Sequence, residues 1–122
     1  MLASNAARSD CGSGPGLQNL GARGGLTLGF AAQPQPIRVG QHFALLVWLC
    51  PPGDAPVTLN RVDADMPAHR HGMNYRVDLT PLAPNQWRAS GLMFHMPGRW
   101  RLQFDVSSSL GIERLEHEVD LP

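Results

Sequence analysis

Lysine is absent from this chain: all ten basic residues are arginines, and they balance ten acidic residues, so the formal net charge is zero with neutral histidines. Such a composition offers no basic patch of the kind that binds nucleic acid. Long apolar runs are lacking too, since the longest, residues 43–50, is far shorter than the roughly 20 residues that a membrane-spanning helix needs. We therefore expect neither a nucleic-acid partner nor a membrane span.

The first residues also lack the basic and apolar regions of a secretory signal, so the chain is expected either to be cytosolic or to have lost its export signal. Residues 1–23 are rich in Ala, Ser, Gly and Asn without periodicity, which predicts a flexible leader. A chain of 122 residues, 43% of them hydrophobic, is the size of one domain with a real core. We place that domain at residues 24–122.

Cysteine is scarce, with Cys11 in the Gly- and Ser-rich leader and Cys50 at the end of an apolar run. A disulfide between the two is compatible with the sequence, but nothing in their spacing requires it. Two unpaired thiols are the preferred interpretation, because free cysteine is commonly a small buried apolar residue. The two cysteines therefore do not distinguish an oxidising from a reducing compartment.

Helical periodicity is missing, and short alternating runs separated by turn residues take its place from residue 24 onward. Residues 43–50 are apolar on both parities, as in a central strand covered on both sides. Trp100, Leu102 and Phe104 instead alternate with polar residues, which is typical of a half-buried strand. The pattern predicts an all-β fold, an immunoglobulin-like β-sandwich of about seven strands.

Methionine and histidine are concentrated in two short segments. Apart from the initiator, every methionine and three of the five histidines lie in residues 66–73 and 93–96. Thioether sulfur binds the soft ion Cu(I), and imidazole binds both Cu(I) and Cu(II), whereas zinc and iron sites rarely use methionine. Methionine also forms no disulfide, which suits an oxidising compartment. The two segments predict copper as the bound metal and the periplasm as the location.

In the first segment, His69, His71 and Met73 would share one face of an extended chain, because they are spaced by two. Met66 has the opposite parity and would join them only if the chain turned at Pro67.

The second segment is expected to form the other wall of the site through His95 and Met96, although His95 is equally compatible with a structural role. Met93 is interpreted as core filling. His42 and His117 stand alone and are interpreted as surface or hydrogen-bonded residues. The predicted metal ligands are thus Met66, His69, His71, Met73, His95 and Met96.

Over residues 24–121 the chain resembles the YtkA-like family of small exported bacterial domains. The residues that carry the resemblance are Met66, His69, His71 and Met73 in one loop and Met96, Pro97, Gly98 and Trp100 in the next. The resemblance implies an immunoglobulin-like sandwich that binds copper or serves copper-dependent respiratory assembly. The family's usual export signal is the feature that this sequence does not reproduce.

Three functions compete on this basis. The leading hypothesis is a periplasmic copper-binding protein that sequesters copper or delivers it to a respiratory or copper-resistance protein, without catalysis, since no nucleophile, base and orienting acid are grouped in the sequence. The alternative is an interaction module that docks on a membrane or respiratory partner through a methionine-rich surface. A metalloenzyme is the weakest hypothesis, because it would need an open coordination position and turnover.

Overall fold

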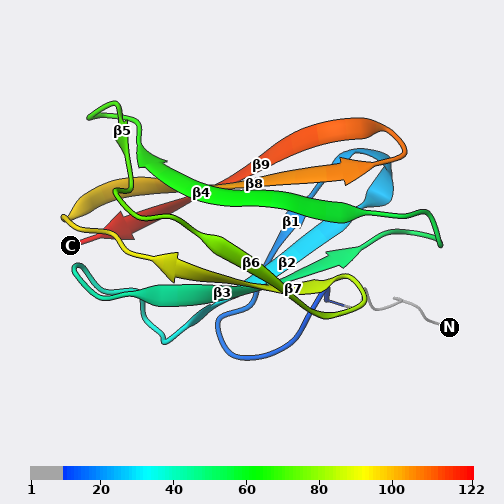
Figure 1. Cartoon of the computed structure of the whole chain (residues 1–122), viewed down its shortest axis with the longest axis horizontal. Helices are drawn as coiled ribbons and strands as arrows, with labels where there is room; N and C mark the ends of the chain where they lie inside the picture. Colours follow the sequence, from blue (N-terminus) through cyan, green and yellow to red (C-terminus); the bar gives the residue numbers. More distant parts are fainter. Residues whose placement is uncertain (1–9) are drawn as a thin grey trace, which may run out of the picture.

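The computed structural model describes residues 10–122, and it confirms the predicted all-β fold. Two antiparallel sheets pack face to face as a β-sandwich, which Figure 1 shows as two layers. In spatial order the first sheet contains β1 (Gln18–Gly21), β2 (Thr27–Gln33), β3 (Phe43–Cys50), β7 (Gln86–Leu92) and β6 (Asp78–Ala83). The second contains β5 (His71–Gly72), β4 (Thr58–Met66), β8 (Gly98–Ser108) and β9 (Gly111–Leu121).

Helical structure in residues 10–122 is limited to one short 3-10 turn, Arg23–Gly25. No helix in this part of the chain is long and apolar enough to cross a membrane.

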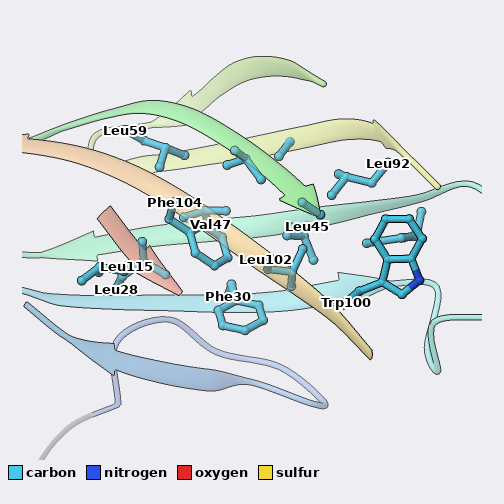
Figure 2. Packing of buried hydrophobic residues seen from close by; sticks show 14 of the residues in the cluster. Leu28, Phe30, Leu45, Val47, Leu59, Leu92, Trp100, Leu102, Phe104 and Leu115 are labelled. Atoms are coloured by element: carbon cyan, nitrogen blue, oxygen red, sulfur yellow. The ribbon is translucent and has the colours of Figure 1, made fainter. Parts of the chain in front are cut away.

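The core lies between the sheets and is filled by alternate residues of each strand. In β3, Leu45 and Val47 are fully buried, while Leu46 between them lies on the outer face and is half-buried. The second sheet contributes Trp100 and Phe104, both 0% exposed. Figure 2 shows side chains from both sheets pointing into this shared interior. Strand periodicity therefore explains the core directly, because a period of two sends every second side chain inward.

The N-terminal segment differs from the prediction of a flexible leader ending at residue 23. Gln18–Gly21 forms β1 and pairs with β2. Cys11 forms a disulfide with Cys50, with their Cα atoms 5.8 Å apart, so the preferred interpretation of two unpaired thiols is wrong. The side-chain amide of Asn19 also binds the backbone N and O of Cys11, both at 3.0 Å. These tertiary contacts extend the folded domain N-terminally beyond residue 24, and residues 1–9 lie outside the described part.

Strand connections bring the two Met/His segments to the same end of the sandwich. β4 and β5 form a hairpin in which Met66 pairs with His71. β7 ends at Leu92, and β8 begins at Gly98, so the second segment fills the connection between them. Figure 1 shows the β4–β5 hairpin projecting at the end of the sandwich near the C-terminus. We call this the His/Met end.

Candidate metal centre

The first segment is a hairpin turn, not the extended chain that was predicted. His69 donates its backbone N–H to the Met66 carbonyl at 3.0 Å, and Arg70 donates to the Pro67 carbonyl at 3.3 Å. Arg70 has a φ of 54°, in the left-handed region that reverses the chain at the end of such a turn. His69 therefore belongs to the turn, and the argument that placed it on one extended face with His71 is wrong.

Met66 is the last residue of β4, and that strand's alternation points its side chain inward, while the turn that begins at Pro67 folds His71 back opposite it. Its side chain is 1% exposed and belongs to the core. A Cβ atom built on Gly98 would lie only 2.6 Å from the Met66 methyl carbon, so this side chain touches the second segment's turn. Gly98 has a φ of 131°, which a residue with a side chain adopts with strain. The Met66 thioether is thus buried where the two Met/His segments meet.

Three imidazole rings form a row across the two segments. The ring centroids of His69 and His71 are 5.8 Å apart, and those of His71 and His95 are 5.4 Å apart. Trp100 lies edge-on to two of them, with centroid distances of 6.0 Å to His71 and 5.3 Å to His95. His95 is therefore the residue of the second segment whose ring lies beside the first segment.

Trp100 has a larger place in this arrangement than the sequence indicated. The resemblance and the strand pattern treat it as a core residue, and it is one, at 0% exposure and stacked on Phe94 at 4.6 Å. Its indole N–H also donates to the Met96 carbonyl at 3.0 Å, which fixes the second segment. The indole thus contacts both the His71 and the His95 ring edge-on. Its position four residues after Met96 was the only sequence signal for this role.

His95 carries an unsatisfied nitrogen. Its Nδ1 atom is buried, and among the described residues it is the one buried side-chain nitrogen or oxygen without a hydrogen-bond partner. An orphaned polar atom of this kind costs about 1–3 kcal/mol, so it needs an explanation. His71 differs, because its Nδ1 lies 3.1 Å from the Gly72 carbonyl and can donate to it. That contact leaves Nε2 of His71 as the nitrogen with a free lone pair.

The two remaining predicted ligands lie at the margins. Met96 is partly buried and packs against the core. Met73 packs against the core as well, and it lines a cavity of about 400 Å³ between β4 and the segment that leads to β6, together with Val62 and Tyr75. No other predicted ligand lines that cavity. The structure therefore places the His69, His71 and His95 rings in one row and pairs Met66 with His71 across the hairpin, whereas Met73 lines a separate cavity.

The other soft and imidazole side chains have separate surroundings. Met93, which was expected in the core, is half-buried and is not among the side chains packed against it. His42 lies with Nδ1 3.2 Å from the Leu92 carbonyl, as expected of a hydrogen-bonded residue. His117 packs against Phe30 at 5.1 Å, and burial lowers its pKa. The rings of His42 and His117 contact Tyr75 and Phe30, not the row at the His/Met end.

Carboxylates near the His/Met end are occupied by arginines. Asp65 precedes Met66 and therefore points to the outer face of the sheet, where Arg101 binds both of its oxygens at 3.0 and 2.8 Å. That hydrogen bond is the main reason why the pKa of Arg101 is raised. Across residues 10–122, no three side chains among His, Cys, Asp and Glu are arranged to hold a metal ion. The row of imidazoles is therefore not by itself a site with three ligands of these types.

No family model, curated protein or solved structure matches this chain. Membership of the YtkA-like family therefore stays a prediction. Function has to be inferred from the side chains at the His/Met end.

Proposed function

We propose that this chain is a periplasmic copper-binding protein that sequesters copper or delivers it to a respiratory or copper-resistance protein. One observation carries the proposal. His71 and His95 come from separate segments, yet their rings lie 5.4 Å apart, and Nδ1 of His95 has no partner in the described residues. A bound metal would give that nitrogen a partner.

The distances are compatible with a shared ion. Metal–nitrogen bonds of about 2.0 Å place two coordinating nitrogens roughly 3–4 Å apart, which rings with centroids 5.4 Å apart can satisfy. Imidazole and thioether together form the soft donor set that suits copper. In this proposal Met66, His71 and His95 are the inner ligands, and His69 on the exposed turn is an outer one. Met73 and Met96 could complete the shell only if their side chains moved toward the row.

The disulfide supports the proposed location. Structural disulfides form and persist in oxidising compartments such as the periplasm, and are rare in the cytosol. A copper site that uses thioethers instead of thiols is protected from disulfide formation in such a compartment. Binding without catalysis is proposed, since the His71 ring contacts those of His69 and His95, and none of the three imidazoles pairs with a carboxylate in the described part of the chain.

Titration of the purified domain with Cu(I) under a competing chelator tests the proposal. The double variant His71→Ala/His95→Ala should bind at least about 100-fold more weakly than the unaltered chain, more than the loss of an outer partner costs. The matched control is His42→Ala/His117→Ala, which removes the same number of imidazoles outside the row and should bind normally. Equal affinity of all three proteins would overturn the proposal and favour the interaction module.

A further inference from the structure

We infer that the ion is soft and monovalent, Cu(I) in nature and Ag(I) as its redox-inert analogue, and that His95 binds it through Nδ1. The inference rests on the proposed function and names its ligand more narrowly. It follows from the charge of the donors, the burial of the site and the state of individual ring nitrogens.

The available donors at the His/Met end are all neutral. The thioether of Met66 and the imidazoles of His71 and His95 bring no negative charge to an ion. The adjacent carboxylate, Asp65, points to the outer face of the sheet and is held there by both bonds from Arg101. No negatively charged ligand would therefore offset the positive charge of an ion in this site.

The surroundings of those donors are apolar on the core side, while the His71 and His95 side chains are themselves half-buried. Met66 is 1% exposed, and the stacked rings of Phe94 and Trp100 are 0% exposed. The cost of moving an ion from water into a low-dielectric site rises with the square of its charge, so a divalent ion pays roughly four times as much as a monovalent one of the same size. Without a carboxylate or thiolate to offset that cost, the site favours a single positive charge.

The number and type of donors point the same way. Two imidazoles and one thioether form a small set that suits Cu(I), whereas Cu(II) prefers a square-planar or tetragonal set of nitrogen and oxygen ligands. No third His, Cys, Asp or Glu side chain in residues 10–122 joins the imidazoles in a group arranged to hold a metal. The binding nitrogens are then Nδ1 of His95, which lacks a partner, and Nε2 of His71, whose Nδ1 faces the Gly72 carbonyl.

Parallel titrations of the full chain with Ag(I), Cu(I) under anaerobic conditions, Cu(II) and Zn(II) test the inference, with histidine ring nitrogens followed by NMR. We expect Ag(I) and Cu(I) to bind one per chain and to shift Nδ1 of His95 and Nε2 of His71. Cu(II) and Zn(II) should bind at least about 100-fold more weakly. Met66→Leu, which conserves side-chain volume, should stay folded and lose Ag(I) affinity.

The outcomes separate the inference from the proposed function. Cu(II) binding as tight as Cu(I) binding, with paramagnetic loss of the signals of the same nitrogens, would overturn the inference and leave a copper-binding protein. Ag(I) binding through Nε2 of His95, or unchanged by Met66→Leu, would also overturn it. Absence of binding by every ion would overturn both.

Discussion

The two ends of the sandwich differ in whether their buried polar groups have hydrogen-bond partners. At one end, the disulfide of Cys11 with Cys50 and the side-chain amide of Asn19 fix the N-terminal segment, and the backbone N and O of Cys11 are both hydrogen-bonded. At the His/Met end, His95 keeps a buried nitrogen without a partner. Groups that only hold a fold together are normally satisfied, so an orphaned group marks the end where a ligand is expected.

Two glycines, one at each end, show the same difference between the ends. A Cβ atom on Gly29 would lie 1.9 Å from the Cys11 carbonyl oxygen, which means that the N-terminal segment crosses directly over β2. At the other end, Gly98 admits the methyl group of Met66. Gly29 therefore lets the backbone of the N-terminal segment pack against the backbone of β2, and Gly98 lets the Met66 side chain pack beside the proposed site.

Removal of the disulfide should give the largest effect on stability. Cys11→Ser/Cys50→Ser opens a link between residues 39 apart in sequence, and we expect a loss of about 2–5 kcal/mol in the free energy of unfolding. Urea denaturation measures it. Because the link lies at the end away from the histidine row, Ag(I) affinity of the folded variant should not change. An equal loss of affinity would mean that the two ends are not independent.

Replacement of the orphaned imidazole should give a smaller effect of the opposite sign. His95→Leu removes a buried unsatisfied nitrogen, so the metal-free protein should gain about 1 kcal/mol while metal affinity is lost. Thermal and urea unfolding without metal measure the gain.

The matched control for that variant is His42→Leu, which removes a satisfied contact with the Leu92 carbonyl and should cost about 0.5–1.5 kcal/mol. Destabilisation of His95→Leu by a similar amount would show that Nδ1 of His95 is satisfied without metal. The contrast between the two ends would then disappear.

Alternation was enough to predict the strands that bury one face, such as β8, where Trp100, Leu102 and Phe104 point inward. It could not predict β1, because Gln18–Gly21 has no alternation and is held by its pairing with β2 and by the nearby disulfide. The predicted strand count of about seven was therefore low, since β1 and the two-residue β5 escape a periodicity argument.

Whether the two Met/His segments bind a metal stays a prediction, but their proximity was predicted from the clustering of Met and His, and His71 and His95 do lie side by side. The turn through Arg70 was missed, since a non-glycine residue with φ of 54° leaves no sequence signal. The orphaned nitrogen of His95 was missed as well, because satisfaction of a polar atom depends on every neighbour in space.

Loss of the Asp105–Arg114 ion pair in acid should give the smallest effect on stability. The hydrogen bond from Arg114 holds the pKa of Asp105 below its usual value near 4. A lowered folded-state pKa means that the unfolded chain binds the proton more readily, so the contribution is present at neutral pH and is lost as pH falls through the folded-state pKa. Asp105→Asn should therefore destabilise the protein at pH 7 and have less effect at pH 3.

The effect stays small because the Arg114 side chain is 47% exposed and solvent screens the pair. Denaturation at the two pH values measures the difference in destabilisation. Asp54→Asn, which changes an exposed carboxylate in the connection between β3 and β4, serves as the matched control. If the destabilisation by Asp105→Asn were the same at both pH values, the pair would act through packing and not through charge. Acid unfolding would then have to originate elsewhere in the molecule.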